Sequence, residues 1–381
     1  MVLKPLLIPD WESYTTANKE GILPSQRIQE LIDGNEIVSR WPISPDQVQP
    51  ASMDLRIGPV AYRIRASFLS NKESTVTDKL RDFTLYEIDL TRPTVLERDC
   101  VYIAPLMEEL RLPKTIWGRA NPKSTTGRID VFTRLITESG GEFESVSEGY
   151  HGKLYTEIVP RTFSITVHEG ARLNQLRLGQ GNAENFSRKL KRETLVYTEH
   201  ELPGKHQLSD EKLWLTVDLQ GDPDSRIVGY RAKRNAPIID LARVNYYDPE
   251  EFWEPVHRTK RANLILDPQD FYILASKQRV SIPPSWAAEM VPYDPSMGEF
   301  RIHYAGFFDP GFGYGAEDVP GTQAVLEVRS HEVPFLLEDG QTVGRLEFEP
   351  LLEVPKRIYG QGIGSSYQRQ GLALSKHFRR G

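Results

Sequence analysis

A gapless internal repeat is the feature that most constrains the fold of this 381-residue chain. The segment "EIVPRTFSITVHEGARLNQLRL", residues 157–178, returns as "EVRSHEVPFLLEDGQTVGRLEF", residues 327–348. The two copies are 170 positions apart, so that Glu157 falls on Glu327 and Gly170 falls on Gly340. We interpret this as two diverged copies of one domain. The competing interpretation is that short hairpins closed by glycine resemble one another.

A second pair of segments supports the duplication. "ASMDLRIG" and "LWLTVDL" are predicted strands, and their alignment pairs Asp54 with Asp218 at a similar but unequal offset. The length of the chain allows two ordinary domains, each with its own core. We therefore predict a first domain over residues 1–195 and a second over residues 196–381, joined by a polar connection.

The spacing of glycine and proline predicts a mainly β fold. There are 28 glycines and 27 prolines, and the short runs between them are rich in β-branched and aromatic residues, as in "VYIAPL", "FSITV", "AVLEV" and "FYILA". Regular short strands separated by turns are typical of a β-sandwich or β-barrel. A few short helices are expected, one following Ser25 as N-cap and ending at Gly34, and another in "DPEEFWEPV".

Composition narrows the classes of function. A net charge of −6 argues against a nucleic-acid-binding protein. No apolar run is long enough for a membrane span and the first residues do not resemble a signal peptide, so a cytoplasmic protein is expected. Cys100 is the only cysteine and the eight histidines are scattered. That pattern excludes a disulfide framework and any zinc site with two thiolates.

Several motifs, in their order along the chain, resemble the 2′-deoxycytidine 5′-triphosphate (dCTP) deaminases, which share the dUTPase fold. "PKSTTGRID" is similar to the phosphate-binding segment of that family, and "GYHGKLYTEI" to the hairpin of its catalytic glutamate. In the second copy "GFFDPGFGYG" resembles the turn that cradles the nucleoside, and "VLEVRS" repeats the glutamate strand. "YGQGIGSSYQRQG" resembles the C-terminal arm that closes over the substrate. The resemblance implies a tandem duplication of a dUTPase-like domain.

The resemblance also implies which residues act. Catalytic roles would fall to Glu157, Ser124 and Arg128, with Glu327 as the equivalent glutamate of the second copy. Nucleotide-binding roles would fall to residues of the phosphate segment, the nucleoside turn and the arm, namely Lys123, Thr125, Asp309, Gly311, Tyr359, Tyr367 and Gln370.

Each copy departs from the family pattern in a different place. The first copy reads "VSEGYHG" where the family has Asp-Pro-Gly, and the second reads "PYDPSMG" where serine and arginine are expected. Ser366 stands where a lysine is common. Only the first copy has all three catalytic residue types, and only the second has the closing arm.

The chemistry of deamination explains why these residue types are needed. Water must be made nucleophilic, and most nucleobase deaminases use zinc held by histidine and cysteine for that purpose. With one cysteine, the remaining route is a glutamate general base in a dry site that raises its pKa. Arg128 would stabilise negative charge and Ser124 would orient the water. Lys123 and Thr125 would reach the triphosphate, which carries Mg²⁺.

We therefore predict a hydrolase that converts dCTP to dUTP and ammonia without zinc, in pyrimidine deoxynucleotide metabolism. One alternative is a dUTP diphosphatase, or a bifunctional enzyme that releases dUMP, with Asp309 activating water. Another is a non-catalytic nucleotide-binding protein. The resemblance also implies a homotrimer with six domains, and inhibition by dTTP is a property of such families. If unlike copies meet, Ser124 and Arg128 would serve Glu327 instead of Glu157.

Overall fold

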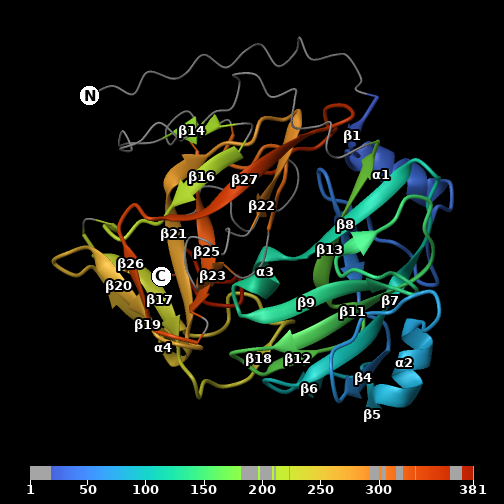
Figure 1. Ribbon diagram of the computed structural model, residues 1–381, viewed down its shortest axis with the longest axis horizontal. Coiled ribbons are helices and arrows are strands. Elements are labelled where there is room, and N and C mark those ends of the chain that lie inside the picture. Colours follow the sequence, from blue (N-terminus) through green and yellow to red (C-terminus); the bar gives the residue numbers. More distant parts are fainter. Residues whose placement is uncertain are drawn as a thin grey trace.

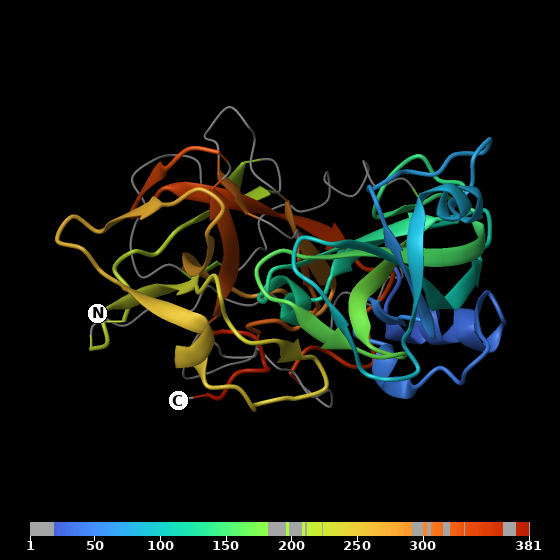
Figure 2. The ribbon, with the colours of Figure 1, turned by 90° about the horizontal axis from the view of Figure 1, so that it is seen from below.

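The computed structural model describes residues 19–181, 196–197, 208–209, 212–222, 224–291, 300–302, 306–314, 321–330, 332–360 and 371–380. These residues form many strands and four short α-helices, which confirms the predicted mainly β fold. Figure 1 shows the two copies side by side, the first in blue and green and the second in yellow to red. The view from below in Figure 2 shows the same separation.

The first copy contains two main sheets. One has the order β5-β4-β7-β11-β9 with β2 on β7, and the other β1-β13-β8-β10 with β3 on β13. The copy comprises β1 (Gly21–Ile22), α1 (Ser25–Asp33), β2 (Ile37–Ser39), β3 (Met53–Arg56), β4 (Val60–Ile64), α2 (Val76–Phe83), β5 (Thr84–Asp89), β6 (Thr94–Leu96), β7 (Val101–Arg111), β8 (Ile116–Pro122), α3 (Ser124–Gly127), β9 (Val131–Thr137), β10 (Ser145–Val146), β11 (His151–Pro160), β12 (Ile165–Val167) and β13 (Arg172–Gln180).

The second copy repeats this plan. Its sheets have the orders β19-β17-β21-β25-β23 and β15-β16-β27-β22-β24, and across the described residues no sheet of either copy closes into a barrel. The copy comprises β14 (Val196–Tyr197), β15 (Leu208–Ser209), β16 (Lys212–Thr216), β17 (Ile227–Ala232), β18 (Ile239–Asp240), α4 (Pro249–Phe252), β19 (Trp253–His257), β20 (Asn263–Leu266), β21 (Phe271–Val280), β22 (Trp286–Val291), β23 (Phe300–Ile302), β24 (Phe307–Phe308), β25 (Thr322–Ser330), β26 (Phe335–Glu338) and β27 (Thr342–Pro350).

Strand register confirms the duplication. Glu157 of β11 pairs with Ile103 of β7, and Glu327 of β25 pairs with Ile273 of β21. Both members of the second pair stand 170 positions after those of the first, the offset of the sequence repeat. Chance similarity of two hairpins would not preserve the partner strands as well, so the two copies share one ancestral topology.

The pairing of Asp54 with Asp218 was wrong. Asp54 of β3 lies opposite Gln175 of β13. Arg345 of β27 is the residue 170 positions after Gln175, and it lies opposite Trp214 of β16. Trp214 is therefore the counterpart of Asp54. Asp218 instead follows β16 and lies four residues beyond the true counterpart of Asp54. Alternating apolar residues around an aspartate recur in many strands, and this similarity misled the alignment. The second copy therefore has no aspartate at the position of Asp54.

Helix α1 is present where it was predicted, but its ends differ. Pro24, and not Ser25, is the N-cap, because the carbonyl of Pro24 accepts the first hydrogen bonds of the helix, from the N–H groups of Arg27 and Ile28 at 2.9 and 3.1 Å. Gly34 has a right-handed φ of −80°, and the left-handed position is taken by Asn35 with φ of 63°. The second predicted helix is α4, capped by the Asp248 side chain.

Residues 371–380 connect the copies through an aromatic cluster. Phe378 packs against Phe252 and Trp253 with ring centroids 5.3 and 5.9 Å apart, and Trp253 packs against Phe163 of the first copy at 5.5 Å. These rings belong to the same continuous core as the apolar residues of the first copy. Among the described residues, no helix has both the length and the apolar character needed to cross a membrane.

Candidate active site

Helix α3 carries the predicted phosphate segment and lies between β8 and β9. Lys123 is its N-cap residue, and the backbone carbonyl of Lys123 accepts hydrogen bonds from the N–H groups of Thr126 and Gly127 at 2.8 and 3.0 Å. Thr125 and Arg128 are buried, whereas Lys123 and Ser124 are half-buried. The Lys123 ammonium forms an ion pair with Asp54 of β3. This short helix thus presents a serine, a threonine and a lysine at one end and an arginine at the other.

The glutamate that meets α3 is Glu327 of the second copy. A Cβ atom on Gly127 would lie 2.8 Å from the Glu327 carboxyl carbon, so the backbone of α3 touches the carboxylate. Burial raises the pKa of Glu327 well above its usual range. The Arg128 guanidinium acts in the opposite direction and Asp130 adds to the rise. Gly127 and Arg128 of the first copy therefore lie close to Glu327 of the second.

The C-terminal segment holds α3 from the other side. The Arg128 Nη1 atom donates a hydrogen bond of 3.0 Å to the carbonyl of Ala373, and the Ser375 hydroxyl donates one of 3.0 Å to the carbonyl of Thr125. These bonds fix the direction in which the Arg128 side chain points.

The predicted nucleoside turn follows β24 and packs against the start of the arm. Gly311 has φ of +92°, a conformation that suits glycine. The Tyr359 N–H donates a 2.7 Å hydrogen bond to the carbonyl of Pro310, and the Phe312 and Tyr359 rings lie 5.6 Å apart. Asp309, Gly311 and Tyr359 are thus brought together, whereas Tyr367 and Gln370 lie outside the described residues.

Asp309 is buried at this turn. Burial raises its pKa to about 6, while Arg177 and Lys123 lower it and Asp54 raises it. Its Oδ1 atom has no hydrogen-bond partner in the described structure. A buried acceptor without a donor suits recognition of a hydroxyl or amine of a ligand.

Glu157, the glutamate of the first copy, has a different environment. It is fully buried, and its Oε1 accepts hydrogen bonds of 3.0 and 2.5 Å from Nε and Nη2 of Arg134. The Arg134 guanidinium is itself stacked 3.5 Å from the centre of the Phe143 ring. Side chains of the first copy therefore occupy the space beside Glu157.

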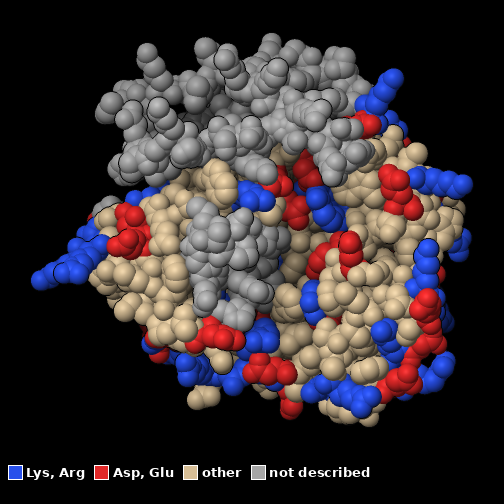
Figure 3. Space-filling model, in the orientation of Figure 1, with Lys and Arg blue, Asp and Glu red and all other residues tan. Residues whose placement is uncertain are grey.

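A cavity of about 310 Å³ opens beside α3. Its basic lining side chains include Lys123, Arg172 and Lys376, and Asp54 is the carboxylate among them. Burial, followed by the nearby charge of Lys123, lowers the pKa of Lys376. Such a basic cavity suits phosphate oxygens. Figure 3 shows charged side chains of both signs around a hollow between the copies.

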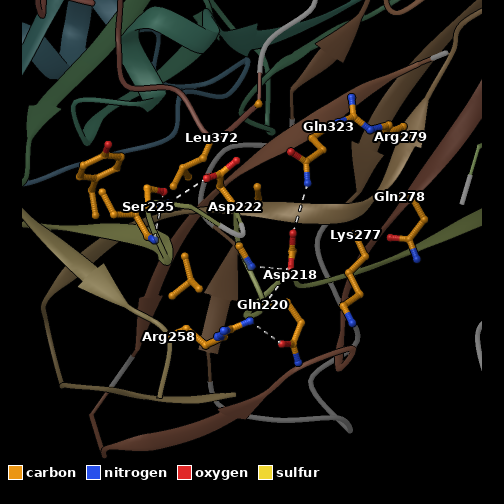
Figure 4. Close-up of a pocket in the computed structure, with 16 residues that line it drawn as sticks. Asp218, Gln220, Asp222, Ser225, Arg258, Lys277, Gln278, Arg279, Gln323 and Leu372 are labelled. Carbon is orange, nitrogen blue, oxygen red and sulfur yellow. Dashed lines mark hydrogen bonds between the residues drawn. The ribbon is translucent and has the colours of Figure 1, made fainter. Parts of the chain in front are cut away.

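A larger cavity of about 820 Å³ lies elsewhere in the second copy (Figure 4). It contains Asp218 and none of the predicted site residues. The Lys277 ammonium lies 2.6 Å from an Asp339 carboxylate oxygen, and Arg258 donates a 3.4 Å hydrogen bond to Gln220. The cavity beside α3, unlike this one, is lined by residues of the predicted phosphate segment, namely Lys123 and Thr125.

Two residues of the site carry no role in the sequence-based prediction. Gly127 stands inside the motif "PKSTTGRID", but only the contact with Glu327 shows its importance. Arg177 belongs to the repeat, where Glu347 stands in the second copy, and nothing in the sequence distinguishes it from a surface arginine.

The fold agrees with the comparisons to known proteins. The model of the 2′-deoxycytidine 5′-triphosphate deaminase N-terminal domain matches residues 19–182, and that of the C-terminal domain matches residues 182–378. The chain therefore belongs to the dCTP deaminase family, and it is an enzyme of that kind, a hydrolase of nucleotide metabolism.

Individual relatives support the assignment. The solved structure of 2′-deoxycytidine 5′-triphosphate deaminase from Agrobacterium tumefaciens is 48% identical with a TM-score of 0.82, over 91% of this chain and 100% of that one. The dCTP deaminase of Natronomonas pharaonis is 30% identical over 41% of this chain and 83% of its own length. A protein of Halobacterium salinarum named dCTP deaminase, dUMP-forming, is 33% identical over 40% and 78%.

Proposed function

We propose that the chain deaminates dCTP to dUTP and ammonia in a composite site, with Glu327 as general base and α3 of the first copy supplying Ser124 and Arg128. The observation that carries this proposal is the contact between the Glu327 carboxylate and the backbone of Gly127. Of the two arrangements left open by the sequence, this contact favours the one in which unlike copies meet.

The residues support a mechanism without zinc. Glu327 takes a proton from a water molecule, whose oxygen attacks C4 of the cytosine ring and forms a tetrahedral centre. Glu327 delivers this proton to N3 of the ring, where it stays. Glu327 then transfers the proton of the new C4 hydroxyl to the C4 amine, so that ammonia leaves and the carbonyl of uracil forms. Arg128 stabilises charge on the intermediate and Ser124 orients the water. The raised pKa of Glu327 suits a base that works near neutral pH.

The nucleotide is proposed to lie between α3 and the turn of the second copy. Lys123 and Thr125 bind the triphosphate with its Mg²⁺, beside the basic cavity. Asp309, Gly311 and Tyr359 bind the nucleoside, and the arm residues Tyr367 and Gln370 close over it. Binding of dTTP at the same place would make it an inhibitor, since its triphosphate and deoxyribose are the same.

A second product is favoured by the names of some relatives. Five of the similar proteins, among them those of Halobacterium salinarum and Nanoarchaeum equitans, are named dUMP-forming. If the same holds here, dUTP would be hydrolysed further to dUMP and diphosphate, with a carboxylate such as Asp309 activating the water. The non-catalytic alternative is less well supported, because the family consists of enzymes.

The assembly, the cell compartment and the domain boundary stay predictions. A homotrimer is the simplest closed assembly for a two-copy chain with a three-fold ring. Cytoplasmic location and division at residues 195 and 196 rest on the sequence. Glu327 and α3 meet within one chain.

The test is ammonia release from dCTP with Mg²⁺, measured for the wild type, Glu327→Gln and Glu157→Gln. We expect Glu327→Gln to lose activity by about 100-fold or more, the range for removal of a general base, and Glu157→Gln to retain most of it. Loss in Glu157→Gln alone would place the site in the first copy. Chromatography of the products distinguishes dUTP from dUMP.

A further inference from the structure

We propose that Arg177 of the first copy is a positioning residue for Asp309 of the second copy, and that it sets the geometry and charge of the nucleoside turn. The inference rests on the proposed function only in taking Asp309 as a nucleotide-binding residue.

Arg177 reaches across the boundary between the copies. It lies on β13, its side chain has no exposed surface, and its guanidinium lies over the Phe307 ring at 4.0 Å. A buried guanidinium is costly unless its charge and its donors are matched by partners. All the partners described below come from the second copy.

These partners are the strands that hold the turn. The Nη1 atom of Arg177 donates hydrogen bonds of 3.0 Å to the carbonyl of Ala288 on β22 and 3.1 Å to Glu349 on β27. The Nη2 atom donates one of 3.4 Å to the carbonyl of Phe308, the residue that immediately precedes Asp309. One side chain thus connects three neighbouring strands at the place where the turn begins.

The strand that precedes Asp309 needs such support. β24 has two residues, and within the described part of the chain it lies at the edge of its sheet with β22 as its neighbour. Two backbone pairs, Ala288 with Phe308 and Glu289 with Phe307, join it to β22, and the Met290 N–H donates a 2.9 Å hydrogen bond to the carbonyl of Gly306 just before it. The bonds from Arg177 to Ala288 and Phe308 therefore link both partners of one of these pairs, and they fix the point from which the Asp309 side chain departs.

The same side chain provides the cation nearest to Asp309. Nη2 of Arg177 lies 3.7 Å from Asp309 Oδ1, at ion-pair distance but too far for a strong hydrogen bond. The other charged groups that act on Asp309 are Lys123 at the head of α3 and Asp54 on β3, which oppose each other. Glu349 on β27 pairs with the Nη1 atom of the same guanidinium, and Glu289 on β22 is the strand partner of Phe307. Arg177 keeps Asp309 ionised while its Oδ1 stays available as an acceptor.

The chain offers a matched control in Arg119 of β8, which is the direct cross-strand neighbour of Arg177. Arg119 also pairs with Glu349, and with Glu289 at 3.1 Å, so it bridges the same two copies. Its described contacts do not include Asp309. A general weakening of the boundary would follow from either substitution, whereas an effect on the turn is expected from Arg177 alone.

The experiment is calorimetric titration of dCTP with Mg²⁺ between pH 5 and 8 into the full-length chain carrying Glu327→Gln, which prevents turnover. Arg177→Gln, Arg177→Lys and Arg119→Gln are each added to this reference chain. For Arg177→Gln we expect affinity to fall about 10- to 100-fold, as for a misplaced binding group. We also expect the acidic limb of the curve of affinity against pH to move up by about one pH unit, because a cation beside Asp309 is lost and the pKa of Asp309 rises. Arg177→Lys should restore the acidic limb, and Arg119→Gln should leave both quantities as in the chain with Glu327→Gln alone.

Equal effects of Arg177→Gln and Arg119→Gln would overturn the inference and leave Arg177 a structural residue. The inference is also overturned if Arg177→Gln moves the acidic limb in a chain that already carries Asp309→Asn, because the shift would then not come from Asp309. If Arg177→Gln does not fold, Arg177→Lys provides the test. Lysine retains the positive charge but lacks the two parallel N–H donors. We then expect its affinity for dCTP to fall while the acidic limb of the affinity–pH curve stays in place. Because binding is measured without turnover, failure of the deaminase proposal in the ammonia assay is a separate result.

Discussion

Arg134 and Glu157 face each other directly across the β9–β11 ladder, and two hydrogen bonds join the guanidinium to a single carboxylate oxygen. The glutamate that the sequence repeat made a catalytic candidate is thereby engaged within its own copy. Its counterpart Glu327 instead touches Gly127 of the other copy. The same residue type at the same place in two related sheets has acquired two environments.

For Glu157→Gln we expect a loss of stability rather than of activity. The substitution removes the negative partner of Arg134, and an incompletely paired buried group costs about 1–3 kcal/mol. Thermal unfolding of the variant should begin at a lower temperature than in the wild type. Unchanged unfolding together with lost ammonia release would contradict both this expectation and the composite site.

Gly127→Ala is expected to disturb the site while the fold is retained. The added methyl group would lie against the Glu327 carboxyl carbon at 2.8 Å, closer than atoms of a packed structure approach. We expect kcat/KM for dCTP to fall about tenfold or more, as the base is displaced. Gly141→Ala is the control, because a Cβ at that exposed glycine meets no atom within 4 Å. Equal activity of the two variants would show that Glu327 is not displaced or not needed.

The acidic limb of the pH–rate profile should lie above the ordinary range of a glutamate. Glu327 must be ionised to act as a base, its pKa is raised by burial, and activity is therefore lost as pH falls through this raised value. Arg128 lowers the pKa of Glu327, so Arg128→Gln should move the limb to still higher pH in addition to reducing the rate. A limb at the usual position of an exposed carboxyl would argue against Glu327 as the base.

The raised pKa of Glu327 also affects stability, because ionisation of this buried carboxyl destabilises the folded state. A carboxyl whose pKa is higher in the folded than in the unfolded state favours folding at low pH, and this contribution is lost as pH rises through the folded pKa. Glu327→Gln, which cannot ionise, should therefore unfold at the same or a higher temperature than the wild type at pH 8. A variant that is less stable at pH 8 would show that the ionised carboxylate is well compensated. Thermal unfolding at pH 5 and pH 8 provides the comparison.

Lys123→Met is expected to weaken recognition of the phosphates. The ammonium at the head of α3 lies beside the basic cavity and pairs with Asp54, whose charge would repel a triphosphate once the lysine is gone. We expect KM for dCTP to rise about tenfold with a smaller change of kcat. Lys153→Met, at an exposed position of β11, should behave as the wild type. A KM unaffected by Lys123→Met would remove this lysine from the phosphate site.

The sequence predicted the mainly β class, the duplication and the helix α4 because each depends on local pattern. The offset of 170 between Glu157 and Glu327 survives in the pairing of their strands, since register is maintained wherever one face of a sheet is buried. Asp54 and Asp218 were misaligned because their resemblance is confined to a few residues, too short to reveal the different offset of this strand in the two copies.

The choice between Glu157 and Glu327 could not be predicted from the sequence. Both glutamates lie between apolar neighbours on equivalent strands, and their difference arises from residues far away in the chain, Arg134 in one case and α3 in the other. Arg177 escaped notice for the same reason, as its partners are backbone carbonyls and a carboxylate of the opposite copy. Interactions between copies leave no local signal.

The division of motifs between the copies determines which parts of the gene are needed and how many nucleotides one chain should bind. The first copy has kept α3 and lost the Asp-Pro-Gly turn, whereas the second has kept the turn and lost the counterpart of Asp54. Since the proposed composite site needs both copies, we expect deletion of either half of the gene to abolish activity. A 381-residue chain with two ancestral domains should accordingly bind one nucleotide at saturation and not two.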